Sequence, residues 1–402
     1  MVAGVTSALW SARSASGLGS LRLGALLGCG FAATTARLGL LGRNGTLGGR
    51  PTGLRPTLRL RLALVLGAVI LSAMGYDAGK AYSSLLKGAF GSKNSIAETL
   101  IQTTPLIFTA LSYAIALRCG MVNLGAEGQL YIGAILGSLA GSHIHGLPPV
   151  IHILFVLLCG FIGGALWGLI VAVLKMKFGA SELITTIMLN YIALEFVSFC
   201  VTNPPFRDAT PGAAPRMPSV VDAVKLPIIL PQTRLHLGII FALIAVLIYY
   251  VFMWKTTRGY EMRVIGMNPN AGRYSGMNIP VNSILSMFLA GGFAGLGGII
   301  NIIGLQYFLT EGFSNNFGFS GVAVALLGGC SPVGIIVSGI LFGALNAGGV
   351  KMQLLAKVPS ASIYMIQGMI IIFAVSRELF IWFGRKLQKE KAHGVTGGEN
   401  HG

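Results

Sequence analysis

The amino-acid sequence predicts an all-α polytopic membrane protein with about ten transmembrane helices. Of its 402 residues, 54% are hydrophobic and only 10% are charged, whereas a soluble domain typically carries about 25% charged residues. Many apolar runs reach the roughly 17–25 residues that a helix needs to cross a hydrocarbon core. Because each backbone polar group in lipid needs an internal partner, such runs form helices. The alternating pattern of a membrane barrel is absent.

The net charge of +17 does not indicate a nucleic-acid-binding protein. Most Lys and Arg residues flank the apolar runs, where they set the orientation of a membrane protein, and they do not gather in a patch that tracks a phosphate backbone. The five cysteines form no C-x-x-C pair, so small apolar side chains are favoured over a disulfide or metal role. We therefore expect lipid, and no nucleic acid, around this chain.

Residues 1–59 differ from the rest because they contain no Asp or Glu and are rich in Gly, Leu, Arg, Ser and Thr. Three interpretations stay open: an organellar transit peptide, a weak extra span over 23–41, or a start codon assigned too early. The third is favoured, because the resemblance given below begins only after this segment. We expect 60–385 to be the transmembrane domain, with a cytoplasmic loop at 255–280, and 386–402 to be a cytoplasmic tail.

The apolar runs predict ten spans. They cover residues 60–76, 95–117, 121–141, 150–174, 181–201, 236–254, 281–303, 318–330, 333–350 and 362–383. The eighth is too short to cross a membrane alone and is expected to be part of a re-entrant element. Placing the amino-terminal side of the first span in the cytoplasm leaves more flanking Lys and Arg inside than outside, which is the usual bias.

Glycines recur every four residues in several spans, a spacing that lets another helix backbone approach closely. These glycines are Gly133, Gly137 and Gly141, then Gly160, Gly164 and Gly168, then Gly291 and Gly295, then Gly339 and Gly343. The pattern predicts tight helix packing rather than phosphate binding.

Three possible catalytic or metal motifs do not hold. The run from Gly318 to Gly321 matches the G-x-S-G of intramembrane serine proteases, but no span after Ser320 supplies the histidine base that this chemistry needs. The histidines His143, His145 and His152 could suggest an external metal site, but no acid or cysteine accompanies them, which disfavours it. The sequence has no GxxxxGK[ST] phosphate loop, so ATP-driven transport requires a separate ATP-hydrolysing subunit.

A first polar segment, residues 118–129, interrupts the apolar pattern. Polar groups are costly in lipid, so Asn123, Glu127 and Gln129 need a reason to lie between two apolar helices. Asn123 is expected to cap a new helix, with Glu127 near its positive end. The segment is either a plain cytoplasmic turn or a helix break that hinges two helices or lines the transport pathway.

A second polar segment, residues 259–276, joins two spans on the side assigned to the cytoplasm. Residues 259–266 are expected to form one short helix, and Asn268 followed by Pro269 is a helix-start signal. Two short helices under a bundle can dock onto another protein. The alternative is an amphipathic loop that rests on lipid headgroups.

Both segments resemble known sequences. The run from Asn123 to Gln129 resembles the N-I-G-A-E-G-Q region of permease subunits of bacterial nucleoside and simple-sugar ABC importers, and Arg263–Gly276 resembles that family's cytoplasmic loop. Gly318–Gly328 and Pro332-x-Gly334 also fit. The likeness runs from about residue 62 to 383 and is stronger to the purine-nucleoside branch than to the ribose branch. Leu124, Gly272 and the long amino-terminal extension depart from the family pattern.

The resemblance implies a permease that is not itself an enzyme and lies in the bacterial cytoplasmic (inner) membrane. It would pair with a second copy or a paralogue, sit on cytoplasmic ATP-binding subunits that hold ATP and Mg, and receive solute from an extracytoplasmic solute-binding protein. No cofactor is expected on this chain. The residues expected to couple it to the ATPase are Gly259, Arg263, Gly266, Asn268, Pro269, Ala271, Arg273 and Gly276. The helix-break motif comprises Arg118, Gly120, Asn123, Gly125, Glu127, Gly128 and Gln129.

Polar residues inside the spans are candidates for the solute pathway. They are Gln102, Asn190, Glu195, Asn301, Gln306, Asn346 and Gln367. Each can instead be a hydrogen bond between helices. An ion-coupled secondary transporter is the rival hypothesis, and Glu195 is its main candidate for an acid deep in a span. A nucleoside, a simple sugar and a flavin-like heteroaromatic solute all remain open as substrates.

Overall fold

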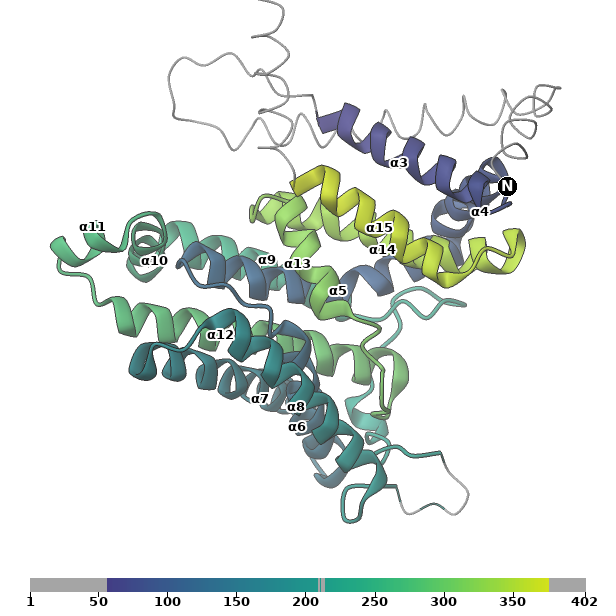
Figure 1. Cartoon of the computed structure of the whole chain (residues 1–402). Helices are drawn as coiled ribbons and strands as arrows, with labels where there is room; N and C mark the ends of the chain where they lie inside the picture. Colours follow the sequence, from purple (N-terminus) through teal and green to yellow (C-terminus); the bar gives the residue numbers. More distant parts are fainter. Residues whose placement is uncertain (1–55, 209, 211–213, 376–402) are drawn as a thin grey trace, which may run out of the picture. The chain divides into compact units, whose positions relative to one another are not determined.

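The computed structural model describes residues 56–208, 210 and 214–375, whose helices are drawn in Figure 1. These described residues are mostly helical, and the only strand-like pairing among them is a bridge between Ile228 and His236. The predicted all-α class is confirmed for this part of the chain. The proposed leader, the possible extra span at 23–41, the end of the tenth span and the tail at 386–402 lie outside it.

The described part of the chain divides into two compact units, one within residues 89–347 and the other within residues 56–88 and 348–375. The larger unit contains α5 (Lys93–Arg118), α6 (Ala126–His143), α7 (Pro149–Phe178), α8 (Glu182–Thr202), η1 (Asp222–Val224), α9 (Gly238–Lys255), α10 (Thr257–Met267), α11 (Pro269–Tyr274), α12 (Ile279–Asn301), η2 (Ile302–Gln306), α13 (Phe317–Leu327) and the start of α14 (Pro332–Ala356).

The smaller unit contains α3 (Pro56–Ala73), most of α4 (Ala78–Phe90), the end of α14 and α15 (Ser360–Val375). In it α15 packs against α3. Near the end of α4, a Cβ added at Gly88 would lie 2.9 Å from the Cα of Gly348, so two glycines allow this close approach. Helix α4 was not predicted, because its Lys, Ser and Gly residues interrupt the apolar pattern.

Six helical elements among the described residues are long and apolar enough to cross a membrane. They are α5, α7, α8, α9, α14 and the continuous element formed by α12 and η2. This confirms a multi-pass helical membrane protein, whereas the predicted number of ten crossings is not confirmed. Each predicted range contains a helix, but α13 has only 11 residues. Helix α6 carries Glu127, Gln129 and several small residues, and most of it is buried against other helices, so it is less apolar than a lipid-facing span.

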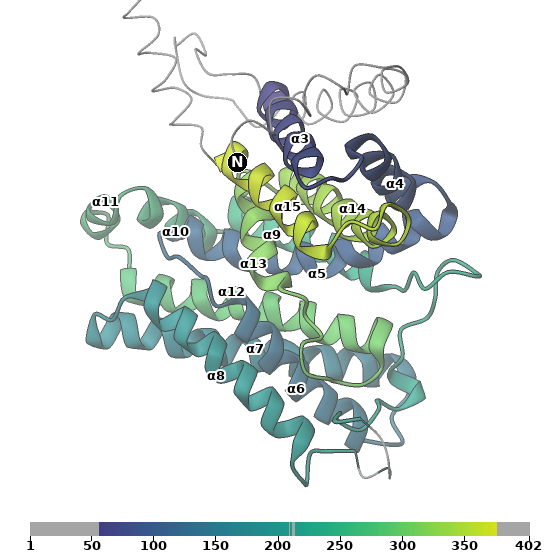
Figure 2. The same ribbon diagram turned by 45° about the vertical axis from the view of Figure 1, so that its right-hand side comes forward.

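The larger unit is built around α12, which packs against α5, α6 and α7. Both ribbon views show α12 beside α6 and α7 (Figures 1 and 2). The most apolar windows of α5 and the α12 element are 83% and 78% buried, against 33% for α8 and α9. Helices α5 and α12 are therefore central, and α8 and α9 face outward.

The predicted glycine grooves are confirmed on α6, α7 and α12. A Cβ added at Gly133 would overlap the Cα of Gly295, and one added at Gly164 would overlap the carbonyl oxygen of Gly291. Backbones that approach this closely leave no room for a side chain at either position. The four-residue spacing thus packs three helices at backbone distance.

Candidate functional site

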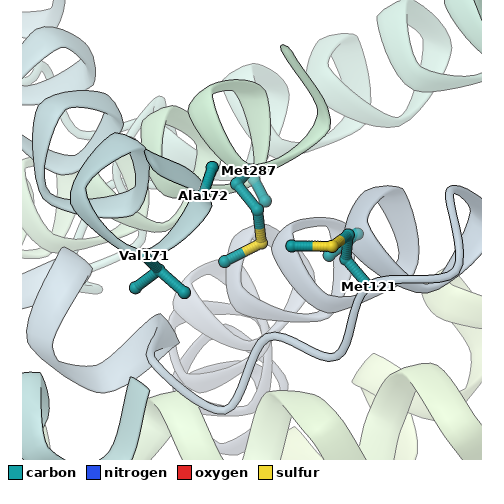
Figure 3. Close-up of a cluster of buried hydrophobic side chains, with 6 residues drawn as sticks. Met121, Val171, Ala172 and Met287 are labelled. Atoms are coloured by element: carbon teal, nitrogen blue, oxygen red, sulfur yellow. The ribbon is translucent and has the colours of Figure 1, made fainter. Parts of the chain in front are cut away.

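The chain turns sharply where α5 ends, at the segment predicted to break two helices. The amide groups of Cys119 and Met121 both donate to the carbonyl of Ala116, at 3.0 Å. Gly120 has φ +77°, in the left-handed region that glycine adopts at least cost. Met121 packs into a buried cluster with Val171, Ala172 and Met287, and the ends of the Met121 and Met287 side chains approach each other in Figure 3. The turn is therefore fixed against α7 and α12.

Asn123 and Gln129 form a buried pair of amides inside this segment. The Nδ2 of Asn123 donates to the Oε1 of Gln129 at 2.9 Å and to Ser112 Oγ at 3.0 Å, while Gln129 Nε2 donates to Asn123 Oδ1 at 3.1 Å. The predicted capping role of Asn123 is wrong: the residue that caps α6 is Gly125, whose amide donates to Asn123 Oδ1 at 3.0 Å. The Asn123 side chain is instead taken up by the amide pair.

The start of α6 is also bound to α8 and α13. Asn190 of α8 accepts from the Gly128 amide at 2.8 Å and donates to the Leu124 carbonyl at 2.9 Å. The carboxylate of Glu127, in the first turn of α6 as predicted, accepts from the Gly318 amide in the first turn of α13 at 2.6 Å. The helix-break motif thus joins α6, α8 and α13 through buried or partly buried polar contacts.

The second polar segment forms α10 and α11, and both helix starts follow the sequence. Thr256 caps α10 by accepting from the Gly259 amide at 3.1 Å. Asn268 caps α11 by accepting from the amides of Asn270 and Ala271, with Pro269 as the first helical residue, so this prediction is confirmed. Most of residues 266–276 are exposed, including Met267 (80%) and Tyr274 (92%). Arg273 and Gly276, whose φ is +76°, belong to this exposed stretch.

The two polar segments touch at backbone level. A Cβ added at Gly266 would overlap the carbonyl oxygen of Arg118, and it would lie 3.0 Å from the amide nitrogen of Gly120. A Cβ added at Gly120 would in turn lie 3.3 Å from the Cα of Gly266. The end of α10 therefore rests directly on the turn after α5. Figures 1 and 2 show α10 and α11 together at one end of the larger unit, which we call the Arg118 end.

Arg118 and Arg263 both lie over the ring of Trp254, at the end of α9. Their guanidinium carbons are 5.4 Å and 5.8 Å from the ring centroid. Arg118 also donates to the carbonyl of Cys330 at 3.1 Å, which accepts from the Tyr249 hydroxyl at 2.9 Å. A movement of α10 would therefore reach the turn between α13 and α14 as well as the turn after α5.

A cavity of about 520 Å³ opens at this end of the larger unit. Its lining residues are Leu117, Arg118, Arg263, Gly266, Met267, Leu326, Gly329 and Cys330. Sequence reasoning did not find Trp254 and Tyr249 as partners of the arginines. A Trp next to Lys255 at the end of an apolar run is typical of a membrane interface, and this is the signal that the sequence offered.

The candidate pathway residues lie in different surroundings. Asn190 is buried and holds the helix break, as described above. Gln102 is within 3.4 Å of Glu98 on α5, and Gln306 donates to the Phe313 carbonyl at 3.4 Å. Asn301 is buried at the end of α12, where the helix widens into the π-helical η2.

Three more candidates complete the set. Glu195 is exposed on the outward face of α8, Asn346 is half-buried on α14, and Gln367 is buried on α15 in the smaller unit. The printed hydrogen bonds of Gln102, Asn190 and Gln306 go to three different partners, so these three candidates do not form one cluster.

The apolar helical spans among the described residues define an integral membrane protein. Residues 95–375 match the family described as branched-chain amino acid transport system / permease component. The chain belongs to this family of permease components and is a multi-pass protein of the cytoplasmic membrane.

Individual relatives are ABC transporter permeases. The chain is 37% identical to the guanosine ABC transporter permease protein of Bacillus subtilis, over 84% of this chain and 97% of that protein. It is 36% identical to a nucleoside ABC transporter permease of Lactococcus lactis, over 79% and 91% of the two chains. It is also 32% identical to a glucose ABC transporter permease of Haloferax volcanii, over 81% and 87%. No solved structure matches this chain.

Proposed function

We propose that this chain is the membrane-spanning subunit of an ATP-binding-cassette importer that translocates nucleosides. Support for the solute comes from relatives with 37% and 36% identity that are named for guanosine and nucleosides. A simple sugar is the second candidate, because a relative with 32% identity is named for glucose. A flavin-like solute is the third, since a probable riboflavin import permease of Treponema pallidum is 25% identical over 66% of this chain.

In this proposal ATP and Mg²⁺ bind a separate subunit, because the chain has no GxxxxGK[ST] phosphate loop. Its partners are cytoplasmic ATP-binding subunits, a second permease copy or paralogue, and an extracytoplasmic solute-binding protein. We also propose that the chain crosses the membrane about ten times, as the sequence predicts.

The Arg118 end faces the cytoplasm in this proposal. The last turns of α5, α7 and α9 all carry basic residues, namely Arg118, Lys175 with Lys177, and Lys255. Positive charge at one set of helix ends is the usual mark of the cytoplasmic side. Exposed α10 and α11 then lie where an ATP-binding subunit can reach them.

The contact between Gly266 and the turn after α5 carries the coupling part of the proposal. Loop helices that were merely tethered would shift without moving the bundle, whereas α10 rests at backbone distance on a turn that joins α5 and α6. Packed backbones transmit displacement because the interior has no slack. A push on α11 and α10 from an ATP-binding subunit therefore moves the helix-break motif.

Uptake by cells that carry the whole transporter separates the proposal from an ion-coupled carrier. We expect uptake of labelled guanosine to stop when ATP is depleted with the ion gradients held, and to persist when an ionophore dissipates the gradients with ATP held. The reverse pattern would contradict the proposal. Competition by unlabelled guanosine, glucose and riboflavin ranks the three solute classes, and an excess of guanosine is expected to compete best.

A further inference from the structure

Arg118 and Arg263 are two cations beside the Trp254 indole ring, and neither has a carboxylate partner among the described residues. Five ion pairs occur among the described residues, and neither arginine takes part in them. The nearest acid on α10, Glu261, is bound to Arg258 at 3.3 Å and to Asn282 at 2.8 Å. Two guanidinium groups at 5.4 Å and 5.8 Å from the Trp254 centroid therefore share a region without a counter-charge from the described residues.

Each of these arginines also has a donor that is not used. The Nε atoms of Arg118 and Arg263 are buried and have no hydrogen-bond partner within the part of the chain that the structure describes. Leaving a buried donor of a charged group unpaired costs free energy. Both residues line the same cavity of about 520 Å³, so a single anion bound there would lie beside both guanidinium groups.

The cavity has the chemistry of a headgroup site. Its remaining walls include the apolar side chains of Leu117, Leu326 and Met267. Trp254 stacks on Tyr250, which is 41% exposed on the outward face of α9, with ring centroids 5.9 Å apart. Basic pockets between helices at the end of a bundle, next to interfacial aromatic rings, suit phosphate groups that carry apolar chains.

We propose that this cavity binds a phosphate-bearing anion, with the phosphate held between the guanidinium groups of Arg118 and Arg263. Arginine binds phosphate through two parallel N–H donors, a geometry that a planar guanidinium presents without rearrangement. The anion is either the headgroup of an anionic phospholipid or a free phosphate compound. This site lies under α10 and is separate from the exposed tip of α11, and its binding does not depend on which solute is transported.

Binding to the full chain, in its assembled transporter, tests the site. The complex is placed in phosphatidylcholine nanodiscs, and two probes are titrated: labelled phosphatidylglycerol and labelled inorganic phosphate. We expect one saturable site per chain for at least one probe. In Arg263→Gln this affinity falls by about tenfold or more, as expected when a charge-assisted pair of hydrogen bonds is removed.

Arg258→Gln is the matched control. It removes the same charge from the same helix, but Arg258 is already paired with Glu261, so its affinity for the probe should stay at the wild-type value. Arg263→Lys keeps the charge without the two-donor geometry, so an intermediate loss is expected, and it guards against a variant that fails to fold.

Each outcome either identifies the source of the bound phosphate or contradicts the proposed site. Binding of phosphatidylglycerol alone identifies a lipid headgroup, and binding of inorganic phosphate identifies a free anion. Equal losses in Arg258→Gln and Arg263→Gln would mean a general surface charge effect and would overturn the proposal. Failure of both probes to bind, with Arg263→Gln instead weakening attachment of the ATP-binding subunits, would show that the pocket receives a protein carboxylate and would also overturn it.

Discussion

The carboxylate of Glu195 lies on the exposed face of α8, next to the exposed rings of Tyr191 and Phe196. An ionised carboxylate facing hydrocarbon is costly, so this side chain needs a polar neighbour in the assembled membrane protein. In the proposed transporter, we expect the solute or the second permease subunit to supply this neighbour. In both cases the acid acts away from the Arg118 end.

We therefore expect Glu195→Gln to change the kinetics of solute uptake while the ATP-binding subunits stay attached. Removing the charge weakens binding of a polar neighbour but leaves the neutral side chain in place. Initial uptake rates as a function of solute concentration, together with co-purification of the ATP-binding subunits, measure the two effects. Wild-type uptake kinetics in this variant would show that Glu195 has only a structural role.

His236 lies at the end of the larger unit opposite the Arg118 end, and we expect it to make the free energy of unfolding depend on pH. It lies just outside α9, is 2% exposed, and its Nδ1 accepts from the Gly238 amide at 3.1 Å. The sequence had placed it as the first residue of the sixth span, but this hydrogen bond puts it before the helix start. Burial lowers the pKa of His236 from its ordinary 6.5 to about 4.

The sign of the pH effect follows from this lowered pKa. Below pH 6.5 the unfolded chain takes up a proton at His236 that the folded chain does not, so stability falls as pH drops from 6.5 toward 4. The loss reaches at most about 3 kcal/mol. Thermal unfolding of the purified protein across this range checks it. His236→Gln keeps an acceptor for Gly238 and is expected to flatten the dependence, whereas an unchanged slope would point to other groups.

At the scale of helices, local signals were the most informative part of the sequence. The cap at Asn268 and Pro269 was predictable because it needs only neighbouring residues. The glycine grooves were predictable because their spacing is itself the signal. The number of membrane crossings was not predictable from the sequence. Helix α6 is polar and buried in the bundle, and α13 is short, so the composition and length of these helices do not show whether they reach both membrane faces.

Much of the candidate site could not be predicted from the sequence, because its contacts join segments that are far apart along the chain. The partner of Gly266 lies at Arg118, and the partner of Glu127 lies at Gly318. No local pattern links such positions. The sequence therefore indicated which residues were unusual, while the structure gave Asn123 a different bonding partner from the one expected.

The exposed helix pair gives a prediction at this scale. Tyr274 is 92% exposed on α11, so Tyr274→Cys should form a disulfide or a short crosslink to a cysteine on the ATP-binding subunit. His145→Cys serves as the control, because His145 is exposed in the loop after α6, away from the Arg118 end. Crosslinked bands on a denaturing gel measure both. Crosslinking from Tyr274→Cys to lipid alone would favour a loop that rests on headgroups.

At the scale of the whole molecule, we propose that ATP hydrolysis is coupled to transport by a mechanical connection between helices. In the proposed mechanism, helices α10 and α11 receive motion from an ATP-binding subunit, and the backbone contact at Gly266 passes this motion to the turn after α5. The amide pair and the bonds to α8 and α13 make that turn rigid, so the helices move together. Arg118 extends the linkage to the turn between α13 and α14.

Solute-stimulated ATP hydrolysis by the reconstituted transporter tests this idea most directly. Gly266→Val inserts a side chain where its Cβ alone would overlap the Arg118 carbonyl, and Arg263→Glu reverses a charge on α10. Gly368→Val is the control, because a Cβ at Gly368 meets nothing within 4 Å. We expect both α10 variants to assemble and keep basal hydrolysis but to lose the solute-stimulated increase and uptake, while Gly368→Val keeps both. Normal solute stimulation and uptake in Gly266→Val and Arg263→Glu would contradict coupling through α10.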